Sequence, residues 1–123
     1  MKIIEAIHKI DDLKHNTYSR EDKVVWLSRM DSMVKRLLID THDGGEVAFT
    51  GYNADTDPET VLLIPEPFDE VYLRWMEAQI DYHNSEDDRY NNAVILFNNA
   101  YEGFKKHYTR TYMPISKGSK FIF

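Results

Sequence analysis

The sequence predicts an all-α fold, a small bundle of about four helices with a long acidic loop between the second and third helices and an extended C-terminal arm. Apolar residues recur at helical spacing in four separate stretches. Three of the five glycines and three of the four prolines lie together in residues 44–67. We place one helical domain over residues 1–112, with the acidic loop (residues 43–67) inserted in it, and the arm over residues 113–123.

The first two helices are predicted over Ile3–Leu13 and Arg20–Thr41. Isoleucines spaced three or four residues apart define the first, and an apolar stripe of about five turns defines the second. Ser19, with Asp22 three residues later, resembles a weak capping box at the start of the second helix. The glycines at 44 and 45 can close its end.

The acidic loop has no helical periodicity. Its segments "EVAF" and "TVLLIP" are β-prone and compatible with a short β-hairpin or two extended arms. Nine acidic residues and no Lys or Arg lie between Leu37 and Leu73. About twenty residues without a helix is long for a compact domain, and such loops are usually functional or partly disordered.

The third helix is predicted to begin just after Pro67 and the fourth to end near His107. Ser85 with Asp88 offers a second weak capping box. The fourth helix carries an aromatic stripe that we interpret as core rather than as a surface for stacking bases, because Arg and Lys do not interleave with it. The stripe comprises Tyr90, Ala93, Val94, Phe97, Tyr101, Phe104 and Tyr108.

The segment "NADTDPE" places oxygen ligands at alternate positions, as the start of an EF-hand loop does. Its ligand candidates are Asn53, Asp55, Asp57 and Glu59. Proline occupies the position of the glycine at the sharp turn, and the twelfth position is an isoleucine instead of a bidentate glutamate. The pattern therefore favours an acidic turn with Asx-type hydrogen bonds over a calcium site.

Catalytic chemistry has almost no support in the sequence. The chain has no cysteine, no HExxH, no GxSxG and no phosphate-binding glycine loop. Carboxylate pairs such as Asp11 with Asp12 would need burial to act as acid and base. We predict no catalytic residue, cofactor or metal site. No stretch approaches the ~20 apolar residues of a membrane span, so we expect a soluble, unprocessed protein.

Two other features bear on partners, and the first is a cluster of asparagines whose amides would bond to a neighbouring loop or subunit or simply face solvent. Asn91 and Asn92 belong to a group of four asparagines within nine residues of the fourth helix, although asparagine is a poor helix former. All 21 acidic residues precede residue 103, whereas the C-terminal segment holds five cations and no acid. An acidic body disfavours broad nucleic-acid binding, and a basic tail suits docking on an acidic neighbour. The tail candidates are Lys117, Lys120, Phe121 and Phe123.

From Pro67 to Pro114 the chain carries a proline before an aromatic-rich helix, then "IDYHNSEDDRYNNA", "FNNAY" and a "YTRTYMP" exit. "DTHDGGE" and "GYNADTD" precede this region. With these segments the sequence resembles a family of phage and prophage head-tail connector proteins, also called adaptor or neck proteins, of long-tailed phages. The resemblance spans nearly the whole chain, and its motifs are structural.

The resemblance implies a helical virion subunit that assembles as a closed ring below the portal protein and extends the DNA channel. The implied partners are other copies of the chain, the portal and a tail-side neck protein, with DNA passing through unbound. The implied locations are the virion neck and, during assembly, the bacterial cytoplasm. A monomer in isolation is compatible with this function. In such a ring Asp55, Asp57 and Glu59 could line the channel and repel DNA.

Two other classes of function remain open from the residues. One is a small intracellular regulatory or scaffolding protein that binds one partner through the acidic loop. The other is a metal-dependent hydrolytic domain. Co-purification with portal rings would separate the connector from the regulatory protein, and calcium or zinc titration would address the hydrolytic domain.

Overall fold

The structure is a computed structural model that describes residues 1–42 and 48–113. Its elements are the α-helices α1 (Ile3–Leu13), α2 (Arg20–Val34), α3 (Glu70–His83) and α4 (Asp87–Thr111), with a π-helical turn, η1 (Lys35–Ile39), directly after α2. The prediction of a small all-α bundle is confirmed.

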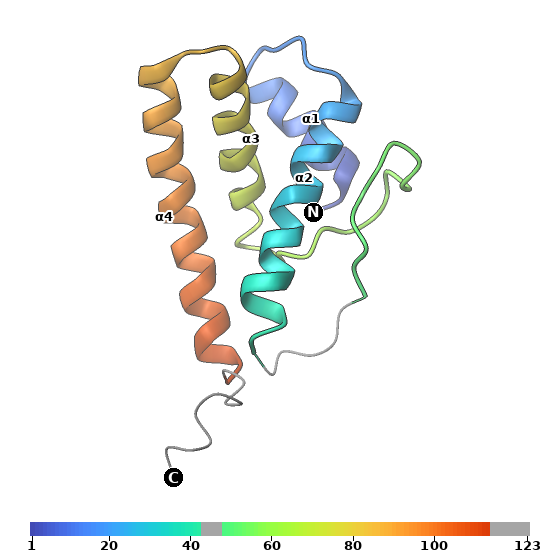
Figure 1. Ribbon diagram of the computed structural model, residues 1–123, viewed down its shortest axis with the longest axis vertical. Coiled ribbons are helices and arrows are strands. Elements are labelled where there is room, and N and C mark those ends of the chain that lie inside the picture. The colour runs from blue at the N-terminus through green and yellow to red at the C-terminus, as the bar shows by residue number, and fades with distance from the viewer. Residues whose placement is uncertain (43–47, 114–123) are drawn as a thin grey trace.

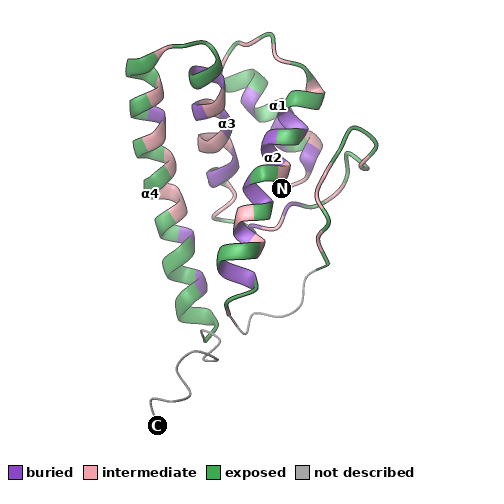
Figure 2. Ribbon diagram, in the orientation of Figure 1, coloured by how far each residue is buried: buried purple, intermediate pink, exposed green. Residues whose placement is uncertain are grey.

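The helices pack around one core, and the acidic loop and α4 lie on opposite sides of it (Figure 1). α3 and α4 form an antiparallel pair, and α3 separates α4 from α1 and the upper part of α2. The purple buried positions in Figure 2 concentrate on α1, α2 and α3, whereas α4 is largely exposed. The largest fully buried side chains include Ile3, Ile10, Leu27, Met30, Leu38, Ile64, Tyr72, Met76 and Ile80.

The described part of the acidic loop pairs with the start of α1 rather than with itself. Val61 forms an isolated antiparallel bridge with Lys2, and Ile3 donates its N–H to the carbonyl of Thr60 at 3.0 Å. Residues 48–67 contain no hairpin. The N–H groups in the first turn of a helix lack acceptors within the helix, and the loop supplies two for α1.

The second helix begins as predicted but changes geometry before its predicted end. Ser19 caps it, because its Oγ accepts the N–H of Asp22 at 3.1 Å. From Lys35 the backbone is π-helical, and the N–H of Asp40 bonds to the Lys35 carbonyl at 2.8 Å. Leu37 in this turn is 56% exposed and Val25 earlier in the helix is 44% exposed, contrary to the place of both in the predicted stripe.

The link between α3 and α4 differs from the prediction in its cap. Ser85 has a φ of 58° and precedes the N-cap residue, Glu86, so the second capping box does not form. α4 also continues past His107 to Thr111, whose Oγ donates to the His107 carbonyl at 2.9 Å. The proline at 114 disfavours helix at the residue before it, and a helix that ends at Thr111 is compatible with that restriction.

The aromatic stripe of α4 faces the core, as predicted. Phe104 is 2% exposed, and Phe97 packs on Trp75 of α3 with ring centroids 5.3 Å apart. At the far end of the helix the ring of Tyr108 meets that of His42 edge to face at 5.4 Å. Among residues 1–42 and 48–113, no helix has both the length and the apolar character needed to cross a membrane.

Candidate functional site

A buried carboxylate holds the acidic loop on the helical core. Asp31 lies on α2 and is fully buried. One of its oxygens accepts the hydroxyl of Tyr72 on α3 at 2.6 Å. The other accepts the hydroxyl of Tyr52 at 2.5 Å and the N–H of Leu63 at 3.1 Å. We call these four residues the Asp31 anchor. It joins α2, α3 and two separate segments of the acidic loop.

The anchor is closed by one more hydrogen bond. The Tyr72 hydroxyl accepts the N–H of Ile64 at 2.7 Å while donating to Asp31. Burial raises the pKa of Asp31, and the hydrogen bonds from Tyr52, Tyr72 and Leu63 oppose that rise. Burial and the facing carboxylate in turn raise the pKa of both tyrosine hydroxyls, which therefore remain protonated donors.

The surroundings of Asp31 favour a structural role for this residue over a catalytic one. A raised pKa is often found at catalytic acids, but those groups must reach a substrate. Asp31 has no exposed surface, and both of its oxygens are occupied by donors from the same chain. A buried carboxylate paired in this way fixes the position of the segments that donate to it.

The acidic loop approaches α2 closely where the described part begins. Gly51 has a φ of 98°, a conformation that residues with side chains rarely adopt. The next N–H, that of Tyr52, donates to the Oγ of Ser28 on α2 at 3.0 Å. A Cβ on Gly51 would lie 3.3 Å from the same oxygen. The backbone angle therefore favours glycine here, and a larger residue would also press on the Ser28 side chain.

The loop tip, residues 53–59, is built from two Asx turns. Asn53 accepts the N–H of Asp55 at 2.8 Å, and Asp57 accepts the N–H of Glu59 at 2.9 Å. This confirms the prediction of Asx-type bonding. The three predicted acidic candidates, Asp55, Asp57 and Glu59, are all exposed on this tip. Lys2 lies 3.5 Å from Glu59, which leaves Asp55 and Asp57 without an ion pair in the described residues.

Metal ligation has no support in the described geometry. Within residues 1–42 and 48–113, no three His, Asp or Glu side chains lie close enough together to hold one ion. Asp11, one of the paired carboxylates, accepts a hydrogen bond from the buried Lys23 at 2.7 Å. Asp81 is buried, and its Oδ1 lies 2.7 Å from the Nζ of Lys14. These carboxylates connect α1 to α2 and α3.

The outward side of α4 has no neighbour in the described chain. Asn91 and Asn92 are exposed on this helix, which lies across the core from the acidic loop (Figure 1), and no hydrogen bond joins their amides to the described residues. Ile95 is 58% exposed and Leu96 44% exposed. A Cβ built on Gly103 would meet nothing within 4 Å. An exposed apolar pair next to asparagines is unexplained by the packing of one copy.

The C-terminal half of α4 is basic. Lys105 lies 4.0 Å from Glu102, whereas Lys106 and Arg110 make no ion pair with the described residues. The predicted arm candidates Lys117, Lys120, Phe121 and Phe123 lie outside the described residues.

Sequence reasoning missed the anchor. Asp31 falls within the apolar stripe of α2, between Met30 and Val34, where a charged residue breaks the pattern. A charged residue at this position was the one sequence feature that could have indicated a buried carboxylate. Its partners could not be read from spacing, because Tyr52, Leu63 and Tyr72 lie 21, 32 and 41 residues away.

Two surface hollows of the described part lie next to the acidic loop. One of about 510 Å³ lies between the end of α2, η1 and residues 49–51. Another, of about 210 Å³, is mainly apolar and lies between the end of α4, η1 and the loop. Its lining includes Val34, Ile39, Leu63, Phe104 and Tyr112.

No protein-family model matches the chain, and no curated protein or solved structure matches it either.

Proposed function

We propose that the chain is a non-enzymatic structural subunit of a phage neck, which forms a ring between the portal protein and the tail-side neck proteins and extends the DNA channel. The family resemblance between Pro67 and Pro114 suggested this function. The observation that supports it best is the placement of two exposed, unlike surfaces on opposite sides of one bundle, the acidic loop tip and the outward side of α4.

A ring of identical subunits needs such a pair of surfaces. Each subunit presents one patch to the neighbour on one side and a different patch to the neighbour on the other side. In Figure 1 the loop and α4 flank the core in this way. The loop is also suited to binding, because the Asp31 anchor and the Asx turns order it before any partner arrives, which lowers the entropic cost of association.

The charge of the chain fits a conduit for DNA. The formal net charge is −6, and all of the excess acid lies before residue 103. A negative ring wall repels the phosphate backbone, so DNA passes without adhering. In this function DNA is cargo that moves past the protein, and the partners are other copies, the portal and the next neck protein.

The test is to mix the purified full chain with the portal protein encoded in the same phage or prophage genome. Multi-angle light scattering across a concentration series gives the mass of the chain alone and of the mixture. We expect a stable complex with the mass of a portal ring plus a ring of this chain. A chain that stays monomeric alone and with the portal would overturn the proposal in favour of a regulatory module that binds another protein.

A further inference from the structure

The outer face of α4 has the composition of a contact surface. We define it as Asn92, Ile95, Leu96, Asn99, Gly103, Lys106 and Arg110. Apart from Ile95, which is next to Leu96, these residues follow one another at intervals of three or four, so they form one continuous stripe along the helix. Every one of them is exposed.

Gly103 is the least expected member of this face. Glycine weakens a helix relative to alanine, and open space surrounds this one. No contact within the described chain therefore requires the missing side chain. Beside two exposed apolar residues and two asparagines, the glycine leaves room for another backbone to approach the helix closely.

The loop tip offers the complementary charge. Asp55 and Asp57 have no ion-pair partners in the described residues, and Lys106 and Arg110 on the outer face also have none. Close to the tip, Val61 is 63% exposed and supplies an apolar contact like those of the outer face. The two surfaces thus match in charge and both contain exposed apolar side chains.

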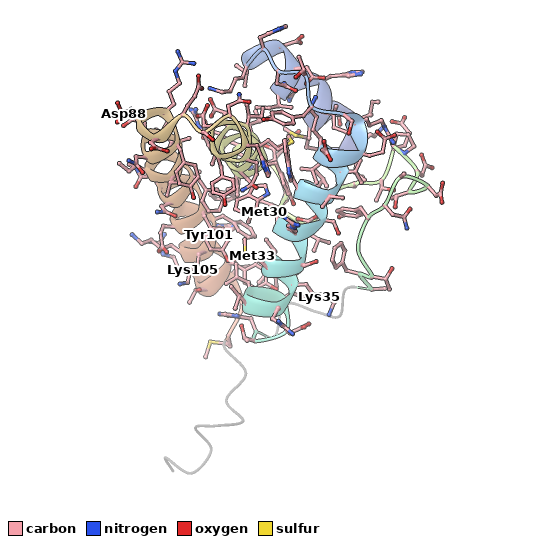
Figure 3. The ribbon with its side chains drawn as sticks, turned by 45° about the horizontal axis from the view of Figure 1, so that its top comes forward. Met30, Met33, Lys35, Asp88, Tyr101 and Lys105 are labelled. Carbon is pink, nitrogen blue, oxygen red and sulfur yellow. The ribbon has the colours of Figure 1, made fainter. Side chains whose placement is uncertain are left out.

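The two surfaces cannot meet within one copy. Figure 1 and Figure 3, which view the molecule from different directions, both place the loop and α4 on opposite sides of the core. Asp88 and Lys105, labelled in Figure 3, mark α4 on the side away from the loop. A contact between these surfaces must therefore join two copies.

We infer that the loop tip of one copy docks on the outer face of α4 of the next copy, with Asp55 and Asp57 facing Lys106 and Arg110. The inference rests on the proposed ring and names its subunit contact. The contact is heterologous, since it uses different patches on the two partners, and repetition of such a contact closes a ring or extends a filament. It places the acidic residues in the interface between subunits instead of in the channel.

Charge-reversed single variants test the contact by complementation. Asp55→Lys alters an exposed carboxylate that accepts no hydrogen bond within the described chain, and Lys106→Glu alters the outer face. Each variant alone brings like charges together, and we expect its self-association in sedimentation velocity to weaken by about tenfold or more. Mixed together, each variant presents the charge that the other needs, so the mixture should associate as strongly as the wild type.

Cysteine cross-linking makes the test independent of how tightly the copies bind. The chain has no cysteine, so a double variant, Asp55→Cys with Lys106→Cys, carries only the two introduced thiols. With a short bis-maleimide linker we expect a ladder of covalent oligomers, because each copy links to two neighbours. The matched control replaces Lys106→Cys with Asp88→Cys, another exposed position on α4, and should give a much weaker ladder.

Either of two results would overturn the inference. One is a mixture of the charge variants that associates no better than each variant alone. The other is a cross-linked pattern that matches the Asp88 control, or that stops at dimers, as a symmetric contact between two α4 helices would give. Portal binding is scored separately in the same samples. A ladder without portal binding would refute the neck function and keep the contact, and portal binding without a ladder would do the reverse.

Discussion

The Asp31 anchor and the outer face of α4 depart from ordinary burial in opposite directions. On α2 a carboxylate is fully buried, although charged groups normally stay in water. On α4 an isoleucine and a leucine are exposed side by side in the middle of a helix. The buried charge is supplied with three donors, whereas the exposed apolar pair has no partner in the described chain.

The anchor stabilises the fold of a single copy, whereas the outer face of α4 is available for contact with another copy. Removing a partner from a buried carboxylate leaves polar groups without hydrogen bonds, so changes at the anchor should lower stability. No other segment of the described chain packs over the outer face, so changes there should leave folding nearly unaffected and act mainly on association. Mutations in the two regions therefore test whether the anchor controls stability and the outer face controls association.

The largest effect is expected from Asp31→Ala. The substitution leaves two tyrosine hydroxyls and the Leu63 N–H without their acceptor in the core, so the free energy of unfolding should fall by about 3–5 kcal/mol. Urea denaturation followed by tryptophan fluorescence measures it. Ser32→Ala, at the exposed neighbouring position, is the control and should change the free energy by less than about 0.5 kcal/mol. Equal losses of unfolding free energy in the two variants would show that the anchor does not stabilise the fold.

The two tyrosines should differ in their contributions. Tyr72→Phe removes a fully buried hydroxyl that donates to Asp31 and accepts from Ile64, so we expect a loss of about 2 kcal/mol. Tyr52→Phe removes a donor in a partly buried position and should cost about 1 kcal/mol. The same denaturation experiment ranks them, and the reverse order would show that the loop carries more of the anchor than the core does.

Stability should depend on pH through Asp31. Its pKa is raised by burial above the ordinary value of 3.8, so the folded protein holds this proton more tightly than the unfolded chain does. The contribution of Asp31 to stability therefore falls as the pH rises from 3.8 to the raised pKa, and then levels off. Asp31→Asn has no carboxyl group that titrates in this pH range. The stability of the wild type relative to Asp31→Asn should thus decrease with rising pH, and a difference independent of pH would contradict the raised pKa.

Gly103→Ala should stabilise a single copy. Apart from the nearby backbone of α4, nothing in the described residues lies within 4 Å of the added methyl group, and alanine favours helix over glycine by up to about 1 kcal/mol. Thermal unfolding of dilute protein measures the gain. The same variant should form shorter cross-linked ladders, because the methyl group occupies the space reserved for the neighbour. A stabilised variant with an unchanged ladder would show that no backbone approaches α4 at this residue.

The smallest effect on folding is expected from Ile95→Ser. This side chain is 58% exposed, so its replacement should change the free energy of unfolding by less than about 0.5 kcal/mol. Its self-association should weaken nonetheless, which sedimentation velocity would detect. A large loss of stability would mean that the outer face contributes to the fold of one copy.

Local sequence patterns determined the helices and the chemistry of the loop tip. The 3.6-residue period located all four helices, Ser19 marked one helix start, and the "NADTDPE" segment predicted the Asx turns. Each of these features depends on residues only a few positions apart, whose geometry the backbone itself imposes. The spacing did not predict the π-helical turn after α2, where the N–H of Asp40 bonds to the Lys35 carbonyl.

Only the tertiary structure decided that Asp31 is buried, that the loop pairs with the start of α1, and that no other described segment packs over the outer side of α4. Each of these facts depends on partners distant in sequence, such as Tyr72, which lies 41 residues from Asp31. A carboxylate ordinarily stays in solvent and is buried only where a core supplies donors, and at Asp31 those donors come from distant groups. The exposed face of α4 follows in the same way, because α3 covers one side of that helix and no described segment covers the other.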